Sequence, residues 1–352
     1  MNVEIRPFDE GSWADAQKLV ESGFGPSAVA ILNKILANPL REPGESAGDI
    51  VYEDDVPVAF QAAMKRRYYV GAKSFFATLP CMLVALPGHS PANLLSLVEH
   101  SISDRFDRKM VLGNTAKPVS LKLHNLLGIT GKGPATCERV QFSILRIGSF
   151  LRFCSHCRLP MYIATLMDVP SRWVNDWFRR TNIELWNEIR VAELNDFWAR
   201  YLKANAGLVA SRSADELKWL FGNEMACGTA LMGVNRNEVG EVVGYVVVKE
   251  SGTCPGRWMV VDWIAVDNDK AVLCQLLHNI KIAIVKLHPN AFLLESIGFP
   301  SNVLTVVQSC LRFSRRIKNN IFAYQAYDAL DVVRPIKDGW FFGPVDGDRC
   351  MG

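Results

Sequence analysis

The chain has 352 residues, 49% of them hydrophobic, and its 39 basic and 36 acidic residues leave a net charge of +3. This length exceeds the size at which single hydrophobic cores usually stop growing, so we expect two domains. So small a net charge does not favour an extended nucleic-acid surface, and we expect no nucleic-acid partner. The basic runs Lys65-Arg66-Arg67 and Arg315-Arg316-Ile317-Lys318 are expected to be solvated faces.

The sequence contains no segment that predicts export or membrane insertion. No apolar run reaches the roughly 18 residues that span a bilayer, and residues 1–13 lack the basic-then-apolar order of a signal peptide. The nine cysteines form no even framework, which is typical of thiols kept reduced. Cys154 and Cys157 have metal spacing, but the other ligands of a zinc site are missing, so no metal is expected. We therefore expect a cytoplasmic protein without a transmembrane segment.

Two stretches alternate apolar and polar residues around a turn, a pattern typical of β-hairpins. They cover residues 48–70 and 228–252. Aligning the two hairpins gives an offset of 185 residues, which also places Trp13 on Trp198.

The repetition continues beyond the hairpins at slightly smaller offsets. The strand around Cys81 matches the strand around Asp262, and Asn114 matches Asn290. The chain therefore has the pattern of two copies of one unit of roughly 160 residues, which is domain size. We predict domains at residues 1–165 and 191–352.

Each copy predicts the same elements in the same order: two helices, a hairpin, a long apolar strand, a helix, a strand, a short helix ending at glycine, and a final strand pair. In the first copy the long strand, helix, strand and short helix cover residues 74–86, 90–102, 109–112 and 118–128. In the second copy they cover residues 257–266, 269–280, 282–287 and 290–298.

A connector at residues 166–190 separates the two copies. Trp173, Trp177 and Trp186 recur there at helical spacings, which predicts a packed connector helix with buried indoles.

This element order, with an asparagine-containing turn and Gly298-Phe299, resembles the GCN5-related N-acetyltransferase (GNAT) family in its tandem double-domain form. Residues Trp340 to Asp348 also resemble an ending of tandem acyltransferase-like proteins from bacterial surface-polysaccharide clusters. The resemblance implies an α+β fold of two tandem GNAT-like domains, each a mixed, mostly antiparallel sheet flanked by helices. It also implies that two parallel strands splay apart and that an acyl-CoA lies in the gap.

The resemblance places the CoA pyrophosphate at the loop between the long strand and the next helix, where backbone amides at a helix N-terminus bind anions. In the first copy this loop contains Gly88, Ser90 as a helix cap and Pro91, although the family's Gln or Arg and second glycine are missing. In the second copy Asp267 and Asp269 would repel a pyrophosphate. The residues expected to contact acetyl-CoA or another acyl-CoA are Val84, Leu86, Gly88, His89, Ser90 and Asn114.

Two side chains are candidate general bases. Asp262 stands on the long strand of the second copy between Val261 and Trp263, and apolar surroundings raise the pKa of a carboxyl group into a useful range. The alternative is a structural acid. His89 is the second candidate because imidazole changes charge near physiological pH, and its alternative is a surface-loop histidine.

We expect the first domain to bind acyl-CoA and the second to shape the site of a small-molecule amine acceptor, such as an amino sugar or a lipid precursor. Two alternatives stay open. An aminoacyl-tRNA-dependent peptidyltransferase also has paired domains but would want a basic groove. A catalytically inactive scaffold would explain the two imperfect loops. The acyl chain length and the oligomeric state are left open.

Overall fold

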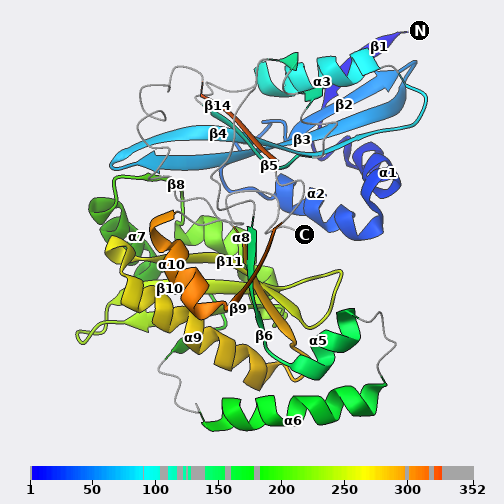
Figure 1. Cartoon of the computed structure of the whole chain (residues 1–352). Helices are drawn as coiled ribbons and strands as arrows, with labels where there is room; N and C mark the ends of the chain where they lie inside the picture. The colour runs from blue at the N-terminus through cyan, green and yellow to red at the C-terminus, as the bar shows by residue number, and fades with distance from the viewer. Residues whose placement is uncertain are drawn as a thin grey trace.

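Figure 1 shows the computed structural model of the chain, in which two sheets with their helices are stacked one above the other. The structure describes residues 2–89, 91–103, 110–116, 122–123, 126–127, 139–154, 160–177, 183–297, 301–316 and 321–326.

The elements of the first half of the chain are β1 Val3–Pro7, α1 Trp13–Phe24, α2 Val29–Leu36, β2 Gly48–Glu53, β3 Val56–Val70, β4 Lys73–Ala85, α3 Pro91–Ser103, β5 Met110–Ala116, β6 Arg139–Ile144, α5 Ile147–Cys154 and α6 Met161–Trp177. Those of the second half are β7 Glu184–Trp186, α7 Val191–Ala204, β8 Leu208–Ala210, α8 Ala214–Ala226, β9 Ala230–Arg236, β10 Val242–Glu250, β11 Arg257–Ala265, α9 Lys270–Leu287, β12 Leu293–Ile297, α10 Ser301–Cys310, β13 Phe313–Arg316 and β14 Ile321–Ala326. No described helix is long and apolar enough to span a bilayer.

The described strands form two sheets that are mixed and mostly antiparallel, as predicted. The first has the order β1-β2-β3-β4-β5-β14, with β8 paired to β3, and the second has the order β13-β6-β12-β11-β10-β9-β7. Each sheet contains one parallel pair among the described strands, β4 with β5 and β11 with β12. The α+β fold class is confirmed.

Both predicted hairpins are confirmed, and β2 with β3 shows how the local sequence makes one. Asp54 and Asp55 occupy the two central turn positions with φ of 47° and 65°. Positive φ at both positions characterises the turn whose twist matches paired strands, and aspartate is among the residues that tolerate it. β9 and β10 form the second hairpin.

Helices cover both faces of the second sheet, as two neighbouring residues of β10 show, since neighbouring strand residues point to opposite sides. On β10 a Cβ added to Gly244 would come within 2.9 Å of Val272 in α9. The ring of the next residue, Tyr245, contacts Phe197 in α7 at a centroid distance of 5.5 Å. α9 and α7 therefore lie on opposite faces of the second sheet.

The strand register supports the repeat seen in the sequence. Ala62 on β3 is paired with Cys81 on β4, and Val247 on β10 is paired with Asp262 on β11. The predicted match of Cys81 with Asp262 thus joins equivalent positions of the two sheets.

The two sheets nevertheless exchange strands relative to the predicted domains. β6 comes from residues 1–165 but pairs with β12 in the second sheet. β14 comes from residues 191–352 but pairs with β5 in the first sheet. The first sheet therefore takes β8 and β14 from the second copy, and the second sheet takes β6 from the first copy (Figure 1). The domain boundaries at 165 and 191 stay a prediction from the sequence.

Two element assignments near the end of the second copy are wrong. The run at residues 282–287, predicted as a strand, is the end of α9, whose buried residues Leu273, Leu277, Ile280 and Ile284 keep a helical spacing. The predicted short helix at residues 290–298 is instead strand β12, which is buried along its whole length. Asn114 therefore lies within β5, whereas Asn290 precedes β12, and the two do not match. The short helix predicted at residues 118–128 lies mostly outside the described residues.

The connector is only partly a helix. α6 ends at Trp177, and Trp186 lies in strand β7, where its side chain is buried as predicted. The side chains of Trp173 and Trp177 lie outside the described residues.

The basic run at residues 65–67 is not a solvated face. Arg66 is completely buried, and its Nε lies 3.5 Å from Oε2 of Glu216 in α8. Lys65 is also buried and pairs with Glu45 at 3.1 Å. The run falls inside because β3 extends beyond its pairing with β2 and pairs there with β8 from the second half of the chain, at Tyr68 with Ala210.

Candidate functional site

The first sheet opens between its two parallel strands. β4 and β5 pair at Ala77 with Met110 and at Thr78 with Val111. Beyond Thr78 the described part of β4 pairs only with β3, while β5 continues beside β14. The pairing of the two parallel strands therefore ends at Thr78, and the rest of β4 is separated from β5.

A β-bulge lies on the open part of β4. Phe60 pairs with Val84 and Ala62 pairs with Cys81, so β4 has one residue more than β3 in this interval. Met82 lies in the bulge with φ of 54°, a left-handed conformation that is uncommon for a residue with a side chain. A bulge here redirects the backbone of β4 at the edge of the gap.

The predicted cofactor loop follows directly at the end of β4. Gly88 has φ of 91°, and a Cβ added there would have open space around it. Leu86 is half-buried, whereas Val84 is buried and packs against Gly23 of α1 rather than standing free in the gap. Asn114 lies on β5 across the gap, with its side chain outside the described part, and Ser90 also lies outside it.

A glutamate that the sequence analysis missed holds this loop. Glu53 lies at the end of β2, and its Oε2 is 2.8 Å from Nδ1 of His89. Its Oε1 accepts a 2.6 Å hydrogen bond from the side-chain amide of Asn93 in α3. Its side chain is mostly buried. The loop itself contains no acid, but the carboxylate of Glu53 lies against it and orients His89.

Asp262 has a different environment from the one expected of a base. Its carboxylate is completely buried, lies 3.3 Å from Nε of the equally buried Arg212, and accepts a 2.5 Å hydrogen bond from the hydroxyl of Tyr245. Burial, and then the charge of Asp262, raise the pKa of Tyr245 far above its usual value. These contacts favour the structural alternative for Asp262.

The structure does not bring the two candidate bases together. Asp262 lies in the middle of the second sheet, whereas His89 lies at the end of the first. Among the described residues, no group of three or more His, Cys, Asp or Glu side chains is arranged to hold a metal ion.

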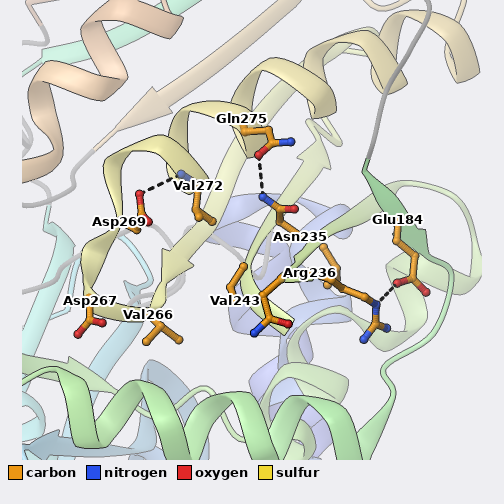
Figure 2. A pocket seen from close by; sticks show the side chains of 11 residues that line it. Glu184, Asn235, Arg236, Val243, Val266, Asp267, Asp269, Val272 and Gln275 are labelled. Carbon is orange, nitrogen blue, oxygen red and sulfur yellow. Dashed lines mark hydrogen bonds and ion pairs between the residues drawn. The ribbon is translucent and has the colours of Figure 1, made fainter. Parts of the chain in front are cut away.

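The equivalent loop of the second copy lies beside a pocket of about 620 Å³ (Figure 2). Asp269 caps α9 by accepting hydrogen bonds from the amides of Ala271 and Val272, and Asp267 lines the pocket next to it. Arg236 on the opposite side is bound to Glu184 at 2.6 Å. That hydrogen bond is the main cause that lowers the pKa of Glu184. With three carboxylates and one guanidinium, this pocket is unfavourable for a pyrophosphate.

Comparisons with known proteins find similarity in structure only. No family model matches the sequence, and no curated protein matches it. A GCN5-related N-acetyltransferase from Kribbella flavida superposes with a TM-score of 0.58 at 11% identity, covering 93% of this chain and 73% of that chain. Saccharomyces cerevisiae N-myristoyltransferase with bound myristoyl-CoA gives 0.55 at 12% identity, covering 92% and 82%. A probable N-acyltransferase of unknown function from Enterococcus faecalis V583 gives 0.55 at 9% identity, covering 93% and 73%.

Proposed function

Because the chain has the fold of the GCN5-related N-acetyltransferases, we propose that it transfers an acyl group from an acyl-CoA thioester to the amine of a small acceptor. The observation that carries the proposal is the separation of β4 from β5, with the bulge at Met82 on one side and the Gly88 loop at its end. The N-acetyltransferase and the N-myristoyltransferase of similar structure support acyl transfer as the general reaction.

Elements of this site can meet two requirements of acyl transfer: stabilising the charged oxygen and binding the CoA pyrophosphate. The amine must be neutral when it attacks the thioester carbonyl, and the oxygen of that carbonyl then carries negative charge. Backbone N–H groups at a bulge can be aimed at such an oxygen. The N-terminus of α3, next to Gly88, offers free amides and a positive dipole end to the CoA pyrophosphate. His89, the sequence's candidate base on this side, lies in the pyrophosphate loop itself, at the opposite end of CoA from the thioester, so its imidazole fits a phosphate contact better than the role of a base.

A second candidate function is that of a catalytically inactive binding or scaffold protein that no longer binds acyl-CoA. Its support is Glu53, whose carboxylate lies 2.8 Å from His89 and therefore close to the proposed pyrophosphate position. A charged carboxylate repels a phosphate, whereas a protonated His89 would offset that charge.

Isothermal titration calorimetry with acetyl-CoA and longer acyl-CoAs separates these possibilities. We expect one-site binding with a dissociation constant between about 1 µM and 1 mM, the usual range of substrate affinities of enzymes. Comparing chain lengths identifies the preferred acyl group. If no binding heat is measured with any acyl-CoA, the proposed acyl transfer is contradicted and the inactive scaffold is favoured. Binding of an aminoacyl-tRNA in its place would favour the peptidyltransferase.

Replacing Gly88 with valine is expected to weaken acyl-CoA binding at least tenfold, about 1.4 kcal/mol at 25 °C. A β-branched residue at φ of 91° distorts the loop that presents the amides of α3. Calorimetric titration of the purified variant measures the change.

Two matched variants locate the effect. Gly71→Val places the same side chain at φ of 55° in the β3–β4 turn, away from the loop, and is expected to bind acyl-CoA within twofold of the unmodified protein. Asp267→Asn alters the loop of the second copy and is expected to do the same. A loss with Asp267→Asn and none with Gly88→Val would assign the cofactor to the second copy.

A further inference from the structure

The helical hairpin of α5 and α6 leaves a large apolar surface exposed. Its exposed apolar side chains, most exposed first, are Tyr162, Leu166, Met161, Ile147, Phe153, Leu151, Met167 and Val169. Tyr162, Leu166 and Met161 are 68%, 67% and 65% exposed, so about two thirds of each residue faces solvent. In Figure 1 the hairpin lies at the end of the molecule opposite the first sheet, where a broad surface can reach it.

α6 is attached to α5 through a narrow stripe. Asp168 accepts a 2.8 Å hydrogen bond from the amide of Gly148 and a 2.6 Å hydrogen bond from the hydroxyl of Ser149 at the start of α5. A Cβ on Gly148 would lie 1.9 Å from the carbonyl oxygen of Ala164, so the two backbones touch there. Between Met161 and Val169, Ala164 and Asp168 are the buried side chains. A helical segment as apolar and exposed as residues 161–169 normally has a further apolar surface against it.

The charge of this part of the chain indicates what that surface is. Residues 145–180 contain six arginines, two aspartates and neither lysine nor glutamate, a net charge of +4, against +3 for the whole chain. One acid, Asp168, is turned inward to cap α5, and one arginine, Arg146, is also buried, so the other charged residues of the segment still sum to +4. The segment is therefore basic in a chain whose other residues together are nearly neutral.

We infer that the α5–α6 hairpin docks on an anionic lipid surface, lying in the headgroup region with Met161, Tyr162 and Leu166 inserted. Exposed aliphatic and aromatic side chains together with arginine are the combination that binds this interface. A second copy of the chain fits less well, because it would bring two +4 segments against each other, whereas an anionic bilayer complements them. This surface is separate from the proposed acyl-transfer site, and the inference does not depend on that site.

Co-sedimentation with phosphatidylcholine vesicles, with and without 30% phosphatidylglycerol, tests the inference on the full chain. We expect binding to the anionic vesicles, at least tenfold weaker binding to the neutral ones, and a loss of several-fold when NaCl is raised from 0.05 M to 0.5 M. The double variant Tyr162→Ser, Leu166→Ser is expected to lose at least tenfold in vesicle binding. Val239→Ser removes an apolar side chain that is 79% exposed in the β9–β10 turn, and it is expected to bind as the unmodified protein does.

Hydrogen–deuterium exchange of the unmodified protein gives a readout that does not depend on how the variant folds. Anionic vesicles are expected to slow exchange in residues 147–169 and to leave the β9–β10 turn unchanged. Absence of vesicle binding, equal binding to neutral vesicles, or protection elsewhere would overturn the inference. A dimer in sedimentation velocity that the double variant converts to a monomer, without vesicle binding, would assign the surface to self-association instead.

Discussion

Replacing Asp262 with alanine is expected to lower the free energy of unfolding by about 3–5 kcal/mol. The change leaves the guanidinium of Arg212 fully buried without its carboxylate and removes the acceptor of the Tyr245 hydroxyl. An uncompensated buried charge is costly because the protein interior cannot solvate it as water does. The loss is a large part of the 5–15 kcal/mol typical of a folded domain, and urea unfolding at 25 °C measures it.

Asp267→Asn is the matched control for Asp262. It removes a carboxylate from the loop after the same strand, and asparagine tolerates the φ of 56° found there. Its effect is expected to stay within about 0.5 kcal/mol. The nearly isosteric Asp262→Asn decides between the two roles of Asp262. If that variant kept full stability but lost acyl transfer, Asp262 would be a base and the structural interpretation would be wrong.

Replacing Arg66 with methionine is expected to destabilise the protein by a similar amount, about 3–5 kcal/mol. Arg66 on β3 pairs with Glu216 on α8, so the pair joins the two halves of the chain. Burial is the main influence on the pKa of Glu216 and raises it, while the charge of Arg66 lowers it. Without Arg66 the pKa rises further above its unfolded value. A group with a raised pKa in the folded state favours folding at low pH, and this contribution is lost as the pH rises. The stability lost in Arg66→Met should therefore be smaller at pH 5 than at pH 8.

The double variant Arg66→Met, Glu216→Leu is the control for this pair. The contact of 3.5 Å is longer than a good charge-assisted hydrogen bond, so its attraction offsets only part of the cost of burying two charges. Apolar residues at both positions are therefore expected to recover most of the stability lost in Arg66→Met. A double variant as unstable as the single one would mean that the pair itself holds the halves together.

Local sequence signals determined a large part of this fold. The two hairpins could be predicted because alternating side chains and the Asp54-Asp55 turn act over a few residues. The repeat matched Cys81 with Asp262 correctly because equivalent strands need the same buried pattern. The start of α3 at Pro91 could be predicted for the same kind of reason, since proline is favoured at the first position of a helix.

Only the tertiary structure decided which sheet each strand joins and which charged side chains are buried. Residues 293–297 are buried on both faces, and a short run of this kind has no period that separates a strand from a helix. The exchange of β6 and β14 depends on which sheet edge each strand meets, which no local pattern encodes. Arg66, Arg212 and Asp262 could not be placed from their neighbours in the sequence, because Arg66 meets Glu216 from 150 residues away and Arg212 meets Asp262 from 50. A charged side chain can be buried only where the fold brings such a partner to it.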